Sequence, residues 1–282
     1  MLPLKAGDPV ARFLSAGGVY GVTPGTYLGT ATSTLTSIDN SKGDVMTSEP
    51  SGSLHQGRWY GSGVALPTGG VWLVSVANRD HVDFPGSEVA DLGTEFWTPQ
   101  TGKWSETAAQ THARTYHNSA ILMPDGRVLV GGHAPIGTFY GPPSDGPAQL
   151  GLAPAYLDPT FQVFSPPYLF WGPRPALKSV DPMMHTNSTV TVEVEKPGDI
   201  SSIRLVRNGS YTHLINGDQR TVELNIVKRD AKSVKSRCRA TPTCRRGRTC
   251  CSPTAPRPRA RSRRCPVRCS STPSWLRSSC TT

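Results

Sequence analysis

Apolar and polar residues alternate along this chain in many short runs, and most runs end in a turn rich in glycine and proline. The stretch SAILMPDGRVLV at 119–130 is typical, because its two apolar halves are joined by Pro-Asp-Gly. That turn chemistry between two apolar runs predicts a β-hairpin. The chain holds 28 Gly and 26 Pro, spread along its length, which favours short strands over long helices. The sequence therefore predicts an all-β protein.

Two segments of the chain resemble each other at a spacing of 56 residues. Residues 57–74 and 113–130 share Arg-x-Tyr, a β-rich run and a Pro-x-Gly turn. Their alignment needs a one-residue gap. Between them, residues 94–106 predict a strand, a turn and an outer strand, which would complete a four-stranded blade. The spacing is close to the kelch repeat, so the pattern predicts part of a β-propeller. The alternative is a pair of unrelated hairpins.

Changes in composition divide the chain into four predicted regions. Residues 1–50 are predicted to form an irregular start and a partial blade, and residues 51–175 the propeller blades. The alternating Val, Thr and Ile residues of 176–234 are typical of a half-exposed β-sandwich, here incomplete, with the boundary near 172–178. Residues 235–282 form a basic tail rich in Cys, Arg, Pro and Ser, which we expect to be disordered.

The net charge of +10 belongs to the tail alone. Residues 235–282 contain 13 Lys and Arg and no acidic residue, which leaves 17 basic against 20 acidic residues in the main body. All seven cysteines, Cys238 to Cys280, also lie there. The tail could be a nucleic-acid-binding arm, a disulfide module or a metal knuckle, although it has no C-x2-C spacing to support zinc. We expect no nucleic-acid partner.

A further interpretation is that the tail is read in a shifted frame of a GC-rich gene. In one alternative frame, residues 248–252 can read Pro-Tyr-Met-Leu-Phe, and residues 261–275 can also give strand-like runs. We therefore expect a frame slip after about residue 235.

Segments that would place the chain in or across a membrane are not predicted. No stretch reaches the roughly 18 apolar residues of a membrane span. The start of the chain lacks the continuous apolar core of a secretory signal peptide. We expect no membrane span, and the chain as written carries no export signal.

Three motifs occur together in this chain: ARTYHNSAILMPDGRVLVGG, FSPPYLFWGPRP and SYTHLINGDQRTVELNI. In this order and at these separations they resemble the copper radical oxidases related to galactose oxidase and glyoxal oxidase. The resemblance covers roughly residues 50 to 233. It implies a kelch propeller followed by an immunoglobulin-like early set domain. It also implies a secreted or cell-surface enzyme that oxidises an alcohol, aldehyde or carbohydrate with O2 and releases H2O2.

The same resemblance implies that Tyr116, His117 and His213 bind one copper ion, with Tyr116 as the catalytic proton acceptor. Two imidazoles and a phenolate suit tetragonal Cu(II) with open positions. Because neighbours in a strand point to opposite faces, Tyr116 and His117 can share a site only near a strand end. The alternatives are a rim histidine bonded to a backbone carbonyl for His117 and a turn residue for His213. The remaining histidines match no motif: His55, His81, His112, His133 and His185.

The family's radical cofactor, a second tyrosine joined covalently to a cysteine, has no counterpart here. No cysteine precedes Cys238, and Tyr60 aligns with Tyr116 one blade earlier. About 170 residues of propeller hold roughly three blades, so we expect an N-terminally truncated chain that is poorly stable alone. We therefore predict an oxidase fragment that keeps copper ligands, lacks the radical site and is inactive by itself. The alternative is a non-catalytic module that binds glycan or a protein partner.

Overall fold

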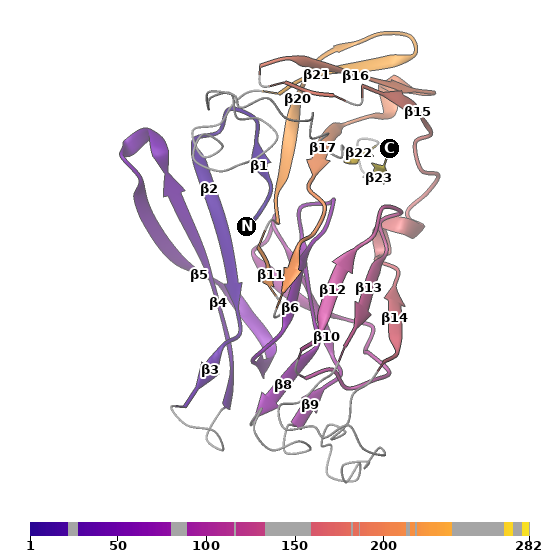
Figure 1. Ribbon diagram of the computed structural model, residues 1–282. Helices are drawn as coiled ribbons and strands as arrows, with labels where there is room; N and C mark the ends of the chain where they lie inside the picture. The colour runs from indigo at the N-terminus through magenta and orange to yellow at the C-terminus, as the bar shows by residue number, and fades with distance from the viewer. Residues whose placement is uncertain are drawn as a thin grey trace, which may run out of the picture.

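The computed structural model of the chain is built almost wholly from β-strands, which confirms the predicted fold class (Figure 1). Its helical turns among the described residues are short: η1 Asn40–Lys42, η3 Pro167–Phe170 and η4 Pro197–Asp199. None of the described helices has the length and apolarity to cross a bilayer. The structure describes residues 1–21, 28–79, 89–115, 117–132, 159–181, 183–185, 187–212, 215–217, 219–238, 268–272 and 278–281.

Two small antiparallel sheets, here called blade 1 and blade 2, lie at the centre of the molecule (Figure 1). Blade 1 has the strand order β11-β10-β7-β6, with bounds β6 Ser62–Ala65, β7 Val71–Val74, β10 Thr94–Thr98 and β11 Lys103–Thr107. Blade 2 has the order β12-β13-β14, with bounds β12 Ser119–Leu122, β13 Val128–Gly131 and β14 Phe161–Phe164. In both blades the first two strands form the predicted hairpin across a Pro-x-Gly turn.

The two blades repeat at a spacing of 57 residues in their strands, one more than the sequence alignment suggests. Ser62 faces Val74 in blade 1, and Ser119 faces Gly131 in blade 2, so each pair is shifted by the same 57 positions. The one-residue insertion of blade 2 therefore lies before its first strand and not within its hairpin.

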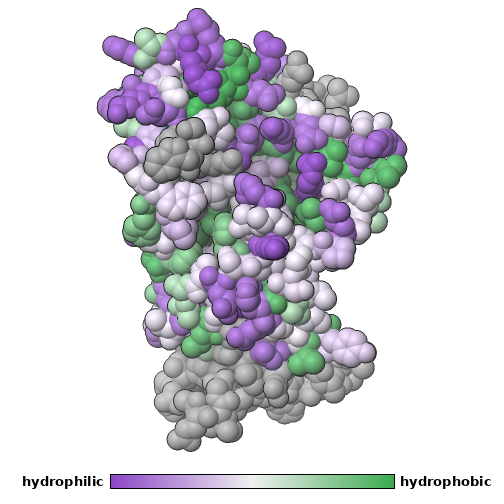
Figure 2. Space-filling model, turned by 180° about the vertical axis from the view of Figure 1, so that it is seen from behind, coloured by the Kyte–Doolittle hydropathy of each residue, from purple (hydrophilic) through white to green (hydrophobic). Residues whose placement is uncertain are grey.

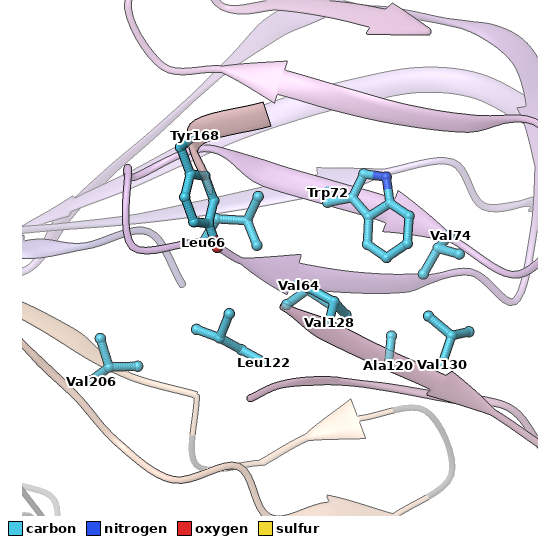
Figure 3. Packing of buried hydrophobic residues seen from close by; sticks show 10 residues of the cluster. All are labelled: Val64, Leu66, Trp72, Val74, Ala120, Leu122, Val128, Val130, Tyr168 and Val206. Carbon is cyan, nitrogen blue, oxygen red and sulfur yellow. The ribbon is translucent and has the colours of Figure 1, made fainter. Parts of the chain in front are cut away.

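Blade 1 and blade 2 pack face to face through one continuous apolar cluster (Figure 3). The Trp72 ring stacks on Phe164 with centroids 3.9 Å apart and an angle of 9° between the planes. Apolar surface removed from water stabilises such an interface by about 25 cal/mol per Å². Both blades and the domain that follows contribute to the cluster: Val64, Leu66, Trp72, Val74, Ala120, Leu122, Val128, Val130, Tyr168 and Val206.

A six-stranded sheet built around a long N-terminal hairpin covers the opposite face of blade 1. Its main strands are β2 Val10–Ala16, β4 Leu28–Asp39 and β5 Val45–Arg58, and shorter strands complete the six-stranded sheet: β3 Val19–Tyr20, β8 Val76–Arg79 and β9 Val89–Asp91. Trp97 and Trp104 of blade 1 are buried under this sheet beside Leu54. Their indole nitrogens donate hydrogen bonds to hydroxyl groups of the hairpin, from Trp97 to Ser51 (3.1 Å) and from Trp104 to Ser33 (3.0 Å).

A buried carboxylate ties this hairpin to blade 1. Glu95 is fully buried and accepts hydrogen bonds from the Arg58 Nε (2.9 Å) and from the His55 backbone N–H. Its Oε2 also lies 2.8 Å from His55 Nδ1. Burial alone would raise the pKa of Glu95, but the hydrogen bonds from His55 and the charge of Arg58 outweigh it and lower that pKa. The hydrogen bond to Glu95 raises the pKa of His55.

The C-terminal domain is an eight-stranded sheet that folds around its own apolar core. Its order is β15-β16-β21-β20-β17-β22-β23, and β1 pairs in parallel with β20. The bounds are β1 Leu4–Lys5, β15 Leu177–Val180, β16 Thr189–Val194, β17 Ser202–Val206, β20 Thr221–Arg229, β21 Ser233–Arg237, β22 Arg268–Thr272 and β23 Ser278–Thr281. The core consists of alternating inward residues: Val190, Val192, Val194, Ile200, Ile203, Leu224, Val234 and Cys238.

The tail departs from the predicted disorder at three places: residues 235–237 complete β21, and β22 and β23 are also strands. β22 pairs antiparallel with β17, and β23 pairs with β22. The physical reason is that the edge of β17 presents unpaired backbone groups, which an extended segment of almost any sequence can satisfy. The rest of the predicted tail after Cys238 lies outside the described residues.

Arg204 links the C-terminal domain to blade 1. Its side chain is buried, forms an ion pair with Glu223 of β20 and donates a hydrogen bond to the backbone carbonyl of Pro67 in the hairpin turn of blade 1. Burial lowers the pKa of Arg204, and the charge of Glu223 opposes that shift. Nearby, Gln219 donates to the Gly63 carbonyl of β6 at 3.4 Å.

Polar and apolar residues are mixed on the outer surface of the molecule. Figure 2 shows the face opposite to that of Figure 1, where hydrophobic residues lie in separate small groups among polar ones. On this face the described residues therefore resemble an ordinary water-exposed surface.

Replacing Arg204 should destabilise the fold strongly. Arg204→Met removes the charge that Glu223 and the Pro67 carbonyl require, so we expect the free energy of unfolding to fall by about 3 kcal/mol. The matched control is Lys178→Met, which removes an exposed ion pair with Glu195 and should change stability by less than about 1 kcal/mol. Urea unfolding followed by tryptophan fluorescence measures both. Equal effects of the two variants would contradict the role of Arg204.

The pair of His55 and Glu95 should make stability depend on pH in a defined window. Because the pKa of His55 is raised in the folded state, its pairing with Glu95 stabilises the fold fully below the unfolded-state pKa of about 6.5. This stabilisation is lost as the pH rises through the folded-state pKa. The lowered pKa of Glu95 adds stability above about pH 4.5 that is lost on further acidification. The unfolding free energies of the parent chain and His55→Gln should therefore differ most near pH 5 to 6.

The control for this titration is Ser53→Ala, a change on the same strand that involves no titrating group. The stability difference between Ser53→Ala and the parent chain should stay constant from pH 4 to pH 8. A difference for His55→Gln that is equally constant over this range would show that the two side chains do not form the charged pair.

Candidate functional site

His117 lies immediately before the first strand of blade 2. β12 begins at Ser119, two residues after His117. His117 has a φ of 49°, a left-handed backbone conformation that breaks the strand-like alternation of neighbouring side chains. Its side chain is exposed. Tyr116 and His213, the other two predicted copper ligands, lie outside the described residues.

Arg114 holds the segment that carries the pair to the outer part of blade 2. Its side chain is 1% exposed. It donates hydrogen bonds to Thr160 Oγ1 (2.9 Å), to Gln162 Oε1 of β14 (3.4 Å) and to the Gly132 carbonyl that follows β13 (3.3 Å). A guanidinium fixed at three places gives this turn a single geometry, because its planar donors leave little freedom.

Asn118 closes the other end of the same segment. It is also 1% exposed, accepts a hydrogen bond from the Ser62 hydroxyl of blade 1 (2.7 Å) and donates to the Arg114 carbonyl (3.2 Å) and the Tyr60 carbonyl (3.5 Å). The segment between Arg114 and Asn118 is therefore bound to both blades at once. A site built there inherits the rigidity of the interface between the blades.

The segment before the first strand has equivalent arginine contacts in the two blades. Arg58 reaches Gly93 and Glu95 in blade 1 just as Arg114 reaches Thr160 and Gln162 in blade 2, so the two arginines have equivalent roles. The left-handed residue that follows is Tyr60 in blade 1, with a φ of 62°, and His117 in blade 2.

Blade 2 therefore has one additional residue between its arginine and its left-handed position. By backbone geometry Tyr60 corresponds to His117, and not to Tyr116 as the sequence alignment suggests.

The segment that carries His213 descends from the C-terminal domain onto the inner strands of both blades. Residues 213 and 214 connect β18 Tyr211–Thr212 with β19 Ile215–Asn216, which pair with each other. Tyr211 and Asn216 line a small cavity of about 20 Å³ together with residues of β6 and β12, among them Val64 and Leu122. Figure 1 shows the orange segment after β17 beside β6 and β12.

Of the three predicted copper ligands, the structure describes His117. Its imidazole is exposed on the turn before β12, and Tyr211 and Asn216 line a cavity together with Leu122 of the same strand. Within the described ranges, no group of three His, Cys, Asp or Glu side chains is close enough to hold a metal ion. Among the other histidines, His55 contacts Glu95, His112 and His185 are exposed, and His81 and His133 lie outside the described residues.

Arg114 and Asn118 were not predicted as positioning residues. The signal for Arg114 was present in the sequence, because the arginine occurs in both copies of the repeat. For Asn118 there was none, since its partners Ser62 and Tyr60 belong to the other blade.

The C-terminal domain matches a known domain family. Residues 174–249 match the model described as "Galactose oxidase-like, Early set domain". A solved structure titled a novel fungal alcohol oxidase with catalytic diversity among the AA5 family, in complex with copper, has a similar fold. Its TM-score is 0.65 at 22% identity, over 81% of this chain and 45% of that chain.

Two curated relatives extend the similarity beyond this domain. A galactose oxidase of Gibberella zeae is 24% identical over 189 residues, which are 65% of this chain and 25% of that protein. The aldehyde oxidase GLOX of Vitis pseudoreticulata is 29% identical over 191 residues, 60% of this chain and 32% of that protein. The chain thus spans between a quarter and a third of the length of these relatives. The chain is similar to galactose oxidase and to the GLOX aldehyde oxidases, and its residues 174–249 match a galactose oxidase-like early set domain.

Proposed function

We propose that this chain is the copper-binding part of an alcohol or aldehyde oxidase, with Tyr116, His117 and His213 as the ligands of one ion. The observation that carries the proposal is the left-handed turn at His117. It is fixed to both blades by Arg114 and Asn118 and lies at the start of the strand on which the hairpin of His213 rests. The names of the relatives, a galactose oxidase and an aldehyde oxidase, support the same chemistry.

The proposed residues have separate tasks. Bound copper supplies a redox-active Lewis acid next to the substrate oxygen. His117 of blade 2 and His213 of the C-terminal domain would hold it as neutral imidazoles. Tyr116 binds as phenolate, which a nearby cation favours, and accepts the proton of the substrate hydroxyl. In the parent enzyme the substrate loses two electrons and two protons to O2, which leaves as H2O2. The parent protein is secreted or held at the cell surface.

The radical site of the family is not assigned in this chain. Cys238 is buried in the apolar core of the C-terminal domain, among Val190, Val192 and Val234. We propose that the chain as given binds copper without turnover, since no cysteine precedes Cys238 in its sequence.

Copper titration of ligand variants tests the assignment. The parent chain should bind one equivalent of Cu(II), with two imidazole nitrogens in its EPR spectrum. Loss of an outer partner typically weakens metal binding by about 10- to 100-fold, so His117→Ala and His213→Ala should each weaken it at least about tenfold. The triple variant with Tyr116→Phe should show no specific binding, while the control His185→Ala, an exposed histidine, should bind like the parent.

Two results would contradict the proposal. Unchanged Cu(II) affinity in the triple variant would exclude these ligands and favour a non-catalytic module that binds glycan or protein. Peroxide formation by the copper-loaded parent chain at an enzymatic rate, with an alcohol or aldehyde present, would show that a radical site exists in this chain after all.

A further inference from the structure

Two triplets in the C-terminal domain have the sequence of an acceptor for an N-linked glycan, which is Asn, any residue except Pro, and then Ser or Thr. They are Asn187-Ser188-Thr189 and Asn208-Gly209-Ser210, and the chain contains no third one. Neither triplet contributes to the apolar cores, and neither belongs to the proposed copper site. The hydroxyl of the third residue assists the attack of the asparagine amide, so the transferase must reach both ends of a triplet.

The triplet at Asn208 forms an exposed turn between β17 and β18. Asn208, Gly209 and Ser210 are all exposed and belong to no strand. Among the described residues, no backbone hydrogen bond of Asn208 or Gly209 is found. A transferase can therefore reach the Asn208 amide without opening the sheet.

The turn is nevertheless well defined. The Ser210 N–H donates to Asn216 Oδ1 at 3.0 Å, and the Ser210 carbonyl accepts a hydrogen bond from the Gly217 N–H at 3.1 Å. A Cβ at Gly209 would lie 2.2 Å from the ring of Tyr211, so a larger residue there would displace that ring. These bonds use the backbone of Ser210 and not its hydroxyl. The turn is thus held in one shape while its acceptor groups remain at the surface.

The triplet at Asn187 is instead part of the hydrogen bonding of the sheet. Asn187 has a left-handed φ of 64°, and its N–H donates to the Cys238 carbonyl at 2.7 Å. The Ser188 carbonyl accepts a hydrogen bond from the Cys238 N–H at 3.0 Å, and Thr189 begins β16, which pairs with β21. A transferase would have to open this end of the sheet to bind the triplet. The structure therefore favours the other triplet.

We infer that Asn208 is an N-glycosylation site that takes an oligosaccharide from a lipid-linked pyrophosphate donor. In this transfer Asn208 Nδ2 forms a bond to C1 of the first sugar, and the bond from C1 to the pyrophosphate oxygen breaks. The pyrophosphate leaves with the electron pair, the amide loses one proton, and nothing is oxidised or reduced. The inference rests on the proposed secretion of the parent protein, because chains meet such donors on the export route.

A glycan on Asn208 would stand beside the junction of the C-terminal domain with the two blades. Gly209, the next residue, lines the small cavity at this junction together with Val64 of β6 and Leu122 of β12. A bulky hydrophilic group on this turn would add solubility at the outer side of the junction.

Mass spectrometry of the chain made in a eukaryotic secretory host tests the inference. The full chain is expressed behind a cleavable secretion signal, so the result does not depend on its own route of export. Glycans are then released with peptide-N-glycosidase F in water labelled with oxygen-18, which leaves a labelled aspartate at each glycosylated asparagine. We expect this label on Asn208 in most molecules. Secreted and cell-retained material are both analysed, because the glycan is transferred before the folding of the chain is checked.

Variants of the triplet show whether the label comes from an N-linked glycan. Ser210→Ala removes the acceptor hydroxyl and keeps the backbone bonds of the turn, so it should abolish the label. Ser210→Thr keeps a hydroxyl and should retain the label. The matched control Asn187→Gln removes the other triplet and should leave the label on Asn208 unchanged. Because an Asn-Gly sequence also deamidates spontaneously, a sample without the glycosidase gives the background.

Three results would overturn the inference. The first is a label on Asn208 that does not exceed the background. The second is a label that survives Ser210→Ala, and the third is a glycan on Asn187 alone. None of them depends on copper. A glycan on Asn208 in a chain that binds no copper would contradict only the proposed copper site, and an unmodified Asn208 in a chain that binds copper would contradict only this inference.

Discussion

The structure depends on the face-to-face packing of two small sheets that could not bury their apolar faces separately. A sheet of three or four short strands exposes much of its surface, so its stability comes from its neighbours. Here the stack of Trp72 on Phe164 and the aliphatic residues around it join blade 1 to blade 2. Val206 extends the same cluster into the early set domain. Three parts of the chain that are distant in sequence therefore share one core.

This shared core explains how the proposed copper site could be built from remote segments. The turn at His117 is bonded to blade 2 through Arg114 and to blade 1 through Asn118, so its position is set by the interface and not by either blade. The hairpin around residue 213 is held in place by its contacts with β6 and β12, and the domain that carries it is bound to blade 1 through Arg204. Rigid elements on both sides give a metal site its required precision.

Much of the fold could be predicted from the sequence, because its signals are local. The Pro-x-Gly turns and the alternating runs on either side identify the hairpins of both blades, and the alternating Val, Thr and Ile residues identify the strands of the C-terminal sandwich. The exact register could not be predicted. A sequence alignment can place the one-residue insertion of blade 2 anywhere in the repeat. The backbone places it between Arg114 and His117, because the left-handed residue lies three positions after the arginine in blade 2 and two positions after it in blade 1.

Features that depend on contacts between distant segments were also not predictable. The sequence gives no indication that Asn118 would bond to Ser62, or that Glu95 would be buried between Arg58 and His55. The strands β22 and β23 of the basic tail were unexpected for the same reason, since their place depends on the open edge of β17 and not on their own composition. The candidate copper ligands came from a resemblance of ordered motifs, to which the geometry adds the position of His117 and its two anchors.

Hydrogen exchange with and without Cu(II) tests most directly whether the interface between the blades gathers these remote segments around one ion. The account predicts that one equivalent of Cu(II) slows amide exchange in residues 114–118 and in residues 211–216 together, with the same dependence on copper concentration. Slower exchange in only one of the two segments, or in neither, would contradict it.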